Sequence, residues 1–309
     1  MHSGMTIGDP VLRIRNIDRV LTFYEKSIGL QVIKKYEAHG DYNGHHLIYE
    51  IGLKYANSNQ RLLILHHDPN AKVASQHSAG LFHFAILVPD RKSLASTYLA
   101  LRNSGVHYDG FADHLVSESL YLRDPENNGI EIYRDRPSRE WPRDEDGHIM
   151  MDTLPLDLNS LIDEINNNNN QEEERNNNIE AFHTGARIGH IHLKVTNLER
   201  SMKFYHEKLG LDITSDWGSM GAAFLSAGGY HHDIGMNTWN SLNGESHIHG
   251  KVGLESFTIT IPDKSTLNIL GSIMQDSSKP EKQQQQTEER GHLLISDPDG
   301  IKFLIKLNN

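Results

Sequence analysis

An internal repeat limits the folds open to this chain. The segment LRIRNIDRVLTFYEKSIGL (residues 12–30) returns as LKVTNLERSMKFYHEKLGL (residues 193–211), at a constant offset of 181 residues. Each copy has the pattern of an alternating strand, then an Asn that caps an amphipathic helix (Asn16 and Asn197), then a Gly that ends the helix before the next strand. The repeat therefore predicts the same supersecondary unit in both halves of the chain.

A second pair of segments repeats at another offset. FAILVPDRKSL (residues 84–94) matches FTITIPDKSTL (residues 257–267), and each copy is followed by short strands that end in an Asp-Pro turn, at Asp124 and Asp297. Strand, helix and three further strands thus recur four times. We predict an α+β fold of four βαβββ modules, over residues 7–68, 80–135, 186–240 and 252–307.

Two polar tracts interrupt this plan. The segment NNNNNQEEERNNN (residues 166–178) lies in a connector between the second and third modules, and EKQQQQTEER (residues 281–290) lies inside the fourth. Neither has apolar side chains to bury, so both are expected to be disordered or solvated loops. The predicted organisation is a first domain over 5–135, a connector over 136–187 and a second domain over 188–309.

The composition of the chain narrows its chemistry. It has 309 residues, no Cys and 20 His, so a metal site must use His, Asp or Glu, and thiol chemistry is excluded. The net charge of −11 argues against a nucleic-acid partner. No apolar run is long enough for a membrane helix, and the opening MHSGMTIGDP is not a signal peptide. We expect a cytoplasmic protein with no membrane partner.

The motifs of the repeats resemble those of one superfamily. Asn-Leu-x-Arg-Ser-x-x-Phe-Tyr and Asp-Pro-x-x-x-Gly-x-Glu are similar to signatures of the vicinal oxygen chelate superfamily, and the match covers nearly all the chain outside the connector. Within it, the sequence looks most like the two-domain extradiol dioxygenases, particularly the bacillus-type catechol 2,3-dioxygenases. The resemblance implies two half-open mixed-sheet barrels, with a divalent metal on the concave side of one of them.

The metal ligands that the resemblance implies are His83, Glu131 and His190. Glu131 stands between Ile130 and Ile132 in an otherwise apolar strand. A carboxylate buried in this way costs several kcal/mol unless it is paired or bound to a metal. Two His and one carboxylate leave open positions on one face of the ion, which is typical of non-haem Fe(II) oxygenases, and Mn(II) accepts the same ligands.

The same positions in the outer modules do not make a metal site. The family's ligand slots fall there on Asp9, Ser256 and Leu304. The implied site therefore requires the second module to pair with the third, whereas the commoner extradiol arrangement pairs consecutive modules of one half. Both arrangements stay open from the sequence. A homo-oligomer is also open, because exposed barrel edges often pair with a second subunit.

Three further residues fall on family positions around the metal. In YHHDIGM (residues 230–236), His232 matches the acid–base histidine, and an imidazole titrates in the range that such a role needs. Tyr121 and His114 match residues that orient substrate oxygens, although Ala112 and Asn127 depart from the signature. An exposed histidine and an aromatic core residue are the alternatives for His232 and Tyr121.

Other histidines are expected to have no such role. The doublets at 45–46 and 66–67 lie in a module without a ligand set and are predicted to be surface residues.

The function implied is an Fe(II)-dependent extradiol dioxygenase that opens catechol-type aromatic diols with O₂, a reaction of aromatic catabolism. One alternative is another metal-dependent enzyme of the superfamily, such as a glyoxalase or isomerase. Glyoxalase sites typically add a second carboxylate, and none stands out at the matching position of the third module, where HHDIGMN offers a His or Asp233 instead. The other alternative is a metal-free binding or resistance protein. The fold alone does not choose among them.

Overall fold

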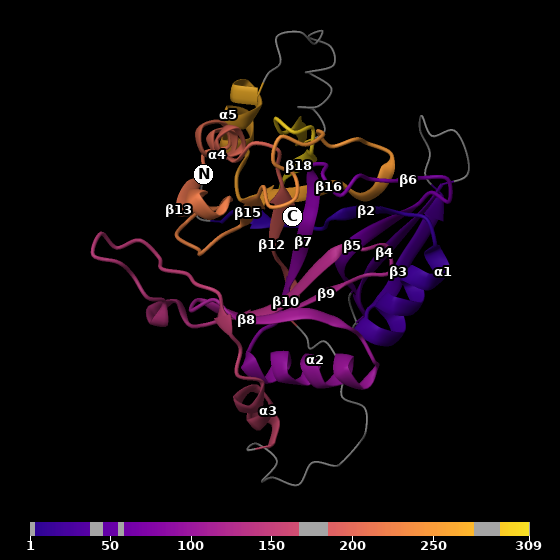
Figure 1. The fold of residues 1–309 in the computed structure, drawn as a ribbon. Helices are drawn as coiled ribbons and strands as arrows, with labels where there is room; N and C mark the ends of the chain where they lie inside the picture. The colour runs from indigo at the N-terminus through magenta and orange to yellow at the C-terminus, as the bar shows by residue number, and fades with distance from the viewer. Residues whose placement is uncertain (1–3, 38–45, 55–58, 167–184, 275–290, 309) are drawn as a thin grey trace. The chain divides into compact units, whose positions relative to one another are not determined.

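The computed structural model describes residues 4–37, 46–54, 59–166, 185–274 and 291–308 (Figure 1). The polar tract over 281–290, all but the first residue of the tract over 166–178, and His45 lie outside these ranges. The chain divides into two compact units. One comprises residues 13–71 and 83–188, and the other comprises residues 1–12, 72–82 and 189–309. We describe each unit by itself.

The unit of residues 13–71 and 83–188 contains two groups of strands. The first begins with the helices α1 (Ile17–Thr22) and η1 (Phe23–Ile28). An antiparallel meander follows, made of β3 (Gln31–Glu37), β4 (Leu47–Lys54) and β5 (Asn59–His67). The second has the order β7 (Gly80–Leu87), α2 (Arg91–Asn103), β8 (Tyr108–Asp113), β9 (Ser117–Arg123) and β10 (Gly129–Asp135). Strand β10 pairs parallel to β7 and antiparallel to β9.

Helices cover one face of the second strand group in this unit. Helix α2 runs along β8, β9 and β10, and α3 (Leu158–Asn166) packs against α2 (Figure 1). Between β10 and α3 the chain forms a short 3₁₀ turn, η2 (Ser138–Glu140), and strand β11 (Leu154–Pro155), which pairs with β8. Asp90 caps the start of α2, because its side chain accepts a hydrogen bond from Ser93 N.

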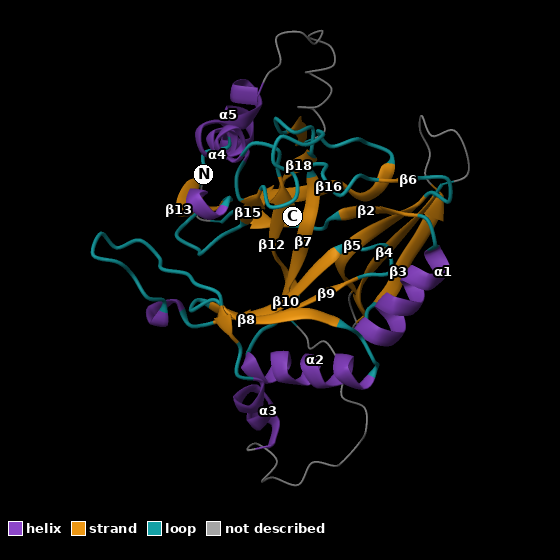
Figure 2. Cartoon of the chain, in the orientation of Figure 1, coloured by secondary structure: helices purple, strands orange, loops and turns teal. Residues whose placement is uncertain are grey.

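The other unit contains two copies of a strand followed by a helix and further strands (Figure 2). Its first copy consists of β12 (Arg187–Lys194), α4 (Leu198–Lys203), η3 (Phe204–Lys208), β13 (Asp212–Trp217), η4 (Gly218–Met220), β14 (Ala222–Ser226) and β15 (Ile234–Asn237). Its second copy consists of β16 (Lys251–Ile261), α5 (Lys264–Met274), β17 (His292–Ser296) and β18 (Lys302–Leu307). Strands β12 and β15 are parallel, as are β16 and β18. The short strands β1 (Thr6–Ile7) and β6 (Lys72–Val73) pair with β16.

The predicted α+β fold is confirmed, and the order of strand, helix and three further strands is found in the first three modules, the first of which begins with β2 (Val11–Ile14); the described residues of the fourth contain two strands after its helix. Asn16 and Asn197 cap their helices, each accepting a hydrogen bond from the backbone N–H three residues later. Gly29 and Gly210 have φ angles of 86° and 78°, which a residue with a Cβ adopts at a cost. The repeated helix differs from an ordinary amphipathic helix because its second half is a π-helical turn.

The repeated Phe-Tyr of the modules has a structural role. Tyr24 and Tyr205 are fully buried in the π-helical turns, and their hydroxyls donate to the carboxylates of the two Asp-Pro turns. The hydroxyl–carboxylate distances are 3.2 Å to Asp124 and 3.1 Å to Asp297. Burial, and then the negative charge of the aspartate, raises the pKa of both tyrosines, so they remain neutral donors. The repeat thus joins a helix of one module to the turn of the next module.

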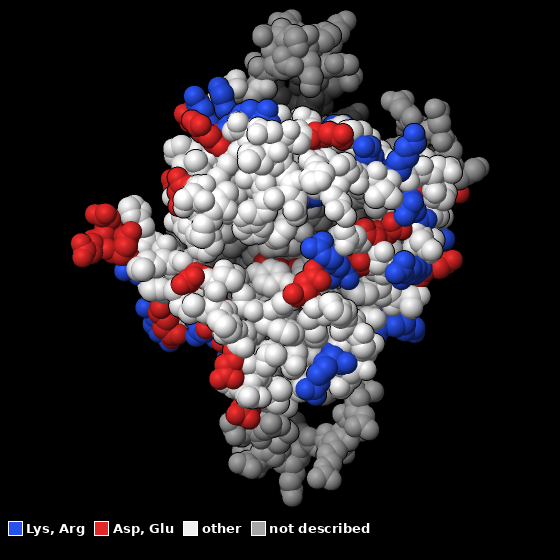
Figure 3. All heavy atoms as spheres, in the orientation of Figure 1, with Lys and Arg blue, Asp and Glu red and all other residues white. Residues whose placement is uncertain are grey.

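Charged side chains of both signs are mixed on the face shown in Figure 3. On the face shown in Figure 3, Lys and Arg are interspersed with Asp and Glu, and no continuous basic patch of the kind that binds phosphates is seen. None of the helices in the described ranges is long and apolar enough to cross a membrane.

Candidate metal centre

The three predicted ligands lie on strands. His83 is on β7, Glu131 on β10 and His190 on β12. Their exposed fractions are 6%, 2% and 1%, so all three side chains are buried. Side chains alternate along a strand, and the apolar neighbours Ile130 and Ile132 therefore lie on the opposite face of β10 from Glu131. The carboxylate has been placed in a buried environment that needs a compensating partner.

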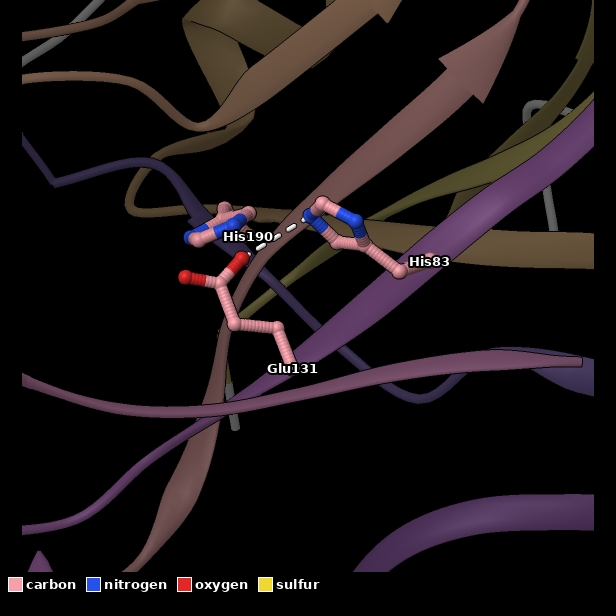
Figure 4. Close-up of side chains that lie close together, drawn as sticks. All are labelled: His83, Glu131 and His190. Atoms are coloured by element: carbon pink, nitrogen blue, oxygen red, sulfur yellow. Dashed lines mark ion pairs between the residues drawn. The ribbon is translucent and has the colours of Figure 1, made fainter. Parts of the chain in front are cut away.

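The partner within the same unit is His83, whose Nε2 lies 2.9 Å from Oε2 of Glu131 (Figure 4). One ligand atom from each of His83, Glu131 and His190 lies within 4.8 Å of the others. Ligands about 2.1 Å from one ion lie roughly 3–4 Å apart, so a grouping of this size could hold a metal ion. Two imidazoles and one carboxylate fit a divalent first-row metal. No second group of this kind occurs in the described part of the chain.

Tyr121 lies directly opposite Glu131 in the antiparallel pair of β9 and β10. Residues opposite each other on adjacent strands share a face, so the side chains of Tyr121 and Glu131 project from the same side of the sheet. The Tyr121 ring is 5.6 Å from the His83 ring, measured between centroids. Burial raises the pKa of Tyr121 well above its usual value, and the charge of Glu131 raises it further. Tyr121 is therefore a neutral phenol that can donate a hydrogen bond.

His114 contacts the same phenol. Its Nε2 lies 2.7 Å from the Tyr121 hydroxyl, and its Nδ1 lies 2.8 Å from the backbone carbonyl of Asp152. A carbonyl only accepts, so Nδ1 carries a proton, and in the neutral ring Nε2 accepts from Tyr121. The alternative of an ordinary core tyrosine does not describe this contact, because the hydroxyl is engaged in a polar chain beside Glu131.

The turn that presents His114 is conformationally costly. Leu115 has a φ of 68°, a value that bulky residues rarely adopt. Asp113 compensates for it, since its side chain accepts a hydrogen bond from Leu115 N, and His114 N donates to the carbonyl of Ser117. Backbone strain of this kind is often found at functional sites. Asn127, which departs from the family signature, adopts a φ of 70°, the conformation that a glycine would favour.

His232 lies beside His190 in the other unit. The centroids of the two rings are 4.1 Å apart, and the ring of Phe224 is 5.0 Å from that of His232. His232 is 8% exposed, so it is not the exposed strand-end residue that was its alternative. The preceding His231 is fully buried and contacts His232. Sequence reasoning missed this partner, because the alternation of buried and exposed residues does not predict that two adjacent residues are both buried.

Asp233, the candidate for a second carboxylate ligand, is used elsewhere. One of its carboxylate oxygens accepts hydrogen bonds from Ser226 Oγ and Ala227 N, both at 2.9 Å. It is not a member of the His83–Glu131–His190 group. The described ligand group therefore contains one carboxylate, which fits the ligand set expected for a dioxygenase. A glyoxalase site would have a second carboxylate.

His192 is a second residue that the sequence did not single out. It is 4% exposed and lies two positions after His190, on the same strand. Its Nε2 lies 3.0 Å from the side-chain nitrogen of Asn237. A Cβ on Gly235 of β15 would come within 2.7 Å of its Nδ1, so the imidazole occupies space that the glycine leaves open.

The prediction of surface histidines at 46 and 66 was wrong. Their exposed fractions are 8% and 1%, and Nδ1 of His46 lies 3.0 Å from Nε2 of His66. His67 is partly exposed. His46 immediately precedes β4 and His66 lies in β5, and the pairing of these two strands brings the two imidazoles together.

Known proteins show the same fold and family. Residues 6–132 and 187–305 match the model for Glyoxalase/Bleomycin resistance protein/Dioxygenase superfamily. The chain is 38% identical over 273 residues to the protein named Catechol-2,3-dioxygenase from Bacillus subtilis (strain 168), with 88% of each chain covered.

Two solved structures have a similar fold at low sequence identity. One, from Bacillus subtilis subsp. subtilis str. 168, is provisionally described as a dioxygenase; it has a TM-score of 0.57 at 12% identity, over 99% of this chain and 86% of that chain. The other is glyoxalase I from Zea mays, with a TM-score of 0.53 at 15% identity, over 97% and 92%. The chain therefore belongs to the Glyoxalase/Bleomycin resistance protein/Dioxygenase superfamily and is an extradiol dioxygenase-like enzyme.

Proposed function

We propose that this protein is an Fe(II)-dependent extradiol dioxygenase that opens the ring of a catechol-type diol with O₂, with Mn(II) as the alternative metal. The observation that carries the proposal is the grouping of His83, Glu131 and His190. The 38% identity to a protein named as a catechol dioxygenase supports the substrate class. The single carboxylate of the group supports a dioxygenase over a glyoxalase-type site.

Each ligand has a role that its surroundings support. His83, Glu131 and His190 would hold the metal, which when bound supplies adjacent coordination positions for a diol and O₂ and lowers the proton affinity of the diol. The ligand residues come from the second and third modules, so the proposal requires these two modules to form one barrel. Burial keeps competing water away from the ligands and strengthens their interaction with a cation.

Tyr121 and His114 would orient the substrate. Tyr121 is held neutral by burial and by the nearby Glu131, and its hydroxyl, which donates to His114, can accept a hydrogen bond from a substrate hydroxyl. The carbonyl of Asp152 fixes the ring of His114, which in turn fixes the Tyr121 hydroxyl. A pre-positioned pair of this kind favours one orientation of the diol before reaction begins.

His232 would move the proton. It lies beside His190, where a diol bound to the metal would lie within reach of its ring. A neutral imidazole can take the proton of the second hydroxyl and return it to a substrate oxygen when the ring opens. Phe224 packs against this imidazole and restricts its orientation.

The test combines metal analysis with turnover. The purified protein is reconstituted anaerobically with Fe(II), and O₂ uptake and the yellow ring-opened product are recorded with catechol and substituted catechols. We expect about one iron per chain. The variants H83A, E131A and H190A should each lose metal affinity and activity by about 100-fold or more. H148A is the matched control, because His148 is exposed and pairs only with Asp144 in the contacts described.

Two results would contradict the proposal. One is full metal content in all three ligand variants. The other is turnover that needs no O₂ and prefers Ni(II) or Zn(II), which would identify a glyoxalase- or isomerase-type enzyme.

A further inference from the structure

His231 immediately precedes the histidine that the proposed reaction uses to move a proton. Its side chain is fully buried, and its Nδ1 lies 2.8 Å from Nδ1 of His232. A hydrogen bond between two imidazole nitrogens contains one proton, so one ring donates and the other accepts. The tautomers of the two rings are therefore linked.

The tautomer of His232 determines what its other nitrogen can do. A neutral imidazole carries a proton on one nitrogen and a lone pair on the other. If His232 donates from Nδ1 to His231, its Nε2 carries the lone pair that a proton acceptor needs. If His231 donates, Nε2 of His232 already carries a proton, and the neutral ring cannot accept another one there.

The backbone around this pair is firmly held. The carbonyl of His231 accepts a hydrogen bond of 2.6 Å from Thr214 Oγ1. On the other side of His232, Asp233 N donates to the carbonyl of Leu225, and Ile191 N donates to the carbonyl of Asp233. The backbone of both neighbours of His232 is thus hydrogen-bonded to strands. These bonds restrict how the two imidazoles can move relative to each other.

The ring of His231 is also restrained. Tyr230 packs on it with 4.1 Å between ring centroids and an angle of 39° between ring planes. His231 does not reach the metal ligands as closely as His232 does, since its ring centroid is 6.3 Å from that of His190, compared with 4.1 Å. Its position suits a residue that acts through His232.

We propose that His231 is a positioning residue, which accepts a hydrogen bond from Nδ1 of His232 and so keeps the lone pair on Nε2 of the ring that lies beside His190. The direction of this bond and its kinetic consequence rest on the proposed function, because His232 needs a lone pair on Nε2 to accept a proton from the diol, whereas the bond itself does not. Two variants separate the bond from the packing. H231N places an oxygen acceptor close to the position of Nδ1, and H231F keeps a ring in the cavity but has no acceptor.

The first measurement reads the tautomer directly. Metal-free protein is labelled with ¹⁵N-histidine, and long-range ¹H–¹⁵N spectra are recorded, with the signals of His232 assigned by their loss in H232Q. We expect a proton on Nδ1 of His232 in the wild type and in H231N, and a mixture of tautomers in H231F. A wild-type His232 that carries its proton on Nε2 would overturn the proposal.

The second measurement is steady-state kinetics with catechol on the Fe(II)-loaded protein. H231F should lower kcat by about 10- to 100-fold with metal content unchanged, and H231N should stay within about 3-fold of the wild type. Equal impairment of both variants, or an unimpaired H231F, would contradict the positioning role. Melting temperatures of the variants control for folding. If the wild type turns over no catechol, the proposed function fails, and the spectra still decide the tautomer.

Discussion

At the scale of single residues, the packing around the proposed metal ligand His190 depends on a glycine that leaves room for a neighbouring ring. His192 lies flat on β15 because Gly235, its partner in the parallel register, has no Cβ. The ring is also held by Asn237 and packs against Phe82 and Trp239. It has little room to retreat, so any atom added at 235 must displace this ring or the strand itself.

A methyl group at 235 tests this packing. We expect G235A to lower the free energy of unfolding by about 1–3 kcal/mol, since the added Cβ would lie 2.7 Å from Nδ1 of His192. G110A is the control, because Gly110 is also in a strand and a Cβ there meets nothing within 4 Å. Denaturant unfolding measures both. The double variant G235A/H192A should lose less than the sum of the single changes, and strict additivity would contradict the contact.

The residues of the candidate site were predictable to different degrees. His83, Glu131 and His190 follow from the repeats and their resemblance to a family, because ligand slots occupy fixed places in each module. His231 and His192 carry no such signal. Their burial arises from strand pairing and from glycines distant in the sequence, and these do not show in a local pattern.

At the scale of elements, a network of buried charges joins four segments of one unit. Glu118 on β9 is 3% exposed, and its carboxylate accepts hydrogen bonds from Arg91 of α2, Arg134 of β10 and Arg136. Arg91 also donates to Glu164 and to the carbonyl of Ser160 on α3. The Glu118 carboxylate thus holds the Arg91 side chain in the position from which it binds α3.

Removing this charge should loosen α3 more than the rest of the unit. E118Q removes the anion that Arg91, Arg134 and Arg136 share, of which Arg134 is buried, and we expect it to cost about 3–5 kcal/mol of unfolding free energy. Hydrogen exchange of the α3 amides should accelerate. E140Q is the control: its partner Arg139 is 81% exposed, and such pairs contribute about 0–1 kcal/mol. Equal effects of the two variants would show that the network does not hold α3.

Element boundaries show where sequence reasoning succeeds and where it stops. The Asn caps and the Gly stops were predicted correctly because a cap depends on one side chain and three or four neighbouring residues. The π-helical turns were not predicted. Their extra residue per turn lets Tyr24 and Tyr205 reach aspartates about 100 residues later, a constraint that local propensity does not contain.

At the scale of the whole molecule, the two halves use the same turn with different electrostatics. In both, the first Asp of the Asp-Pro turn accepts a tyrosine hydroxyl and backbone N–H groups. Burial raises the pKa of Asp124 to about 6 and that of Asp297 to about 7. The difference has a local cause: Asn128 donates from its side chain to Asp124, whereas Ile301 stands at the equivalent place and Asp299 adds a negative charge beside Asp297.

The raised pKa values of these two aspartates make the free energy of unfolding depend on pH in a defined direction. A carboxyl whose pKa is raised in the folded state favours folding while it is protonated, below its unfolded pKa of 3.8. That contribution is lost as the pH rises through the folded pKa. Compared with D297N, the wild type should therefore lose stability between about pH 4 and pH 7, by up to about 4 kcal/mol at 1.4 kcal/mol per pKa unit.

D297N is suited to the measurement because its amide keeps the geometry of the turn. The amide oxygen can accept the N–H groups of Asp299 and Ile301, and the amide nitrogen can donate to the Tyr205 hydroxyl. Urea unfolding of both proteins from pH 4 to pH 8 gives the difference curve. D124N should show the same sign over a narrower window that ends near pH 6, because the pKa of Asp124 is raised less. A flat difference curve for D297N would mean that Asp297 stays ionised throughout this range, and that the donors around the turn outweigh its burial.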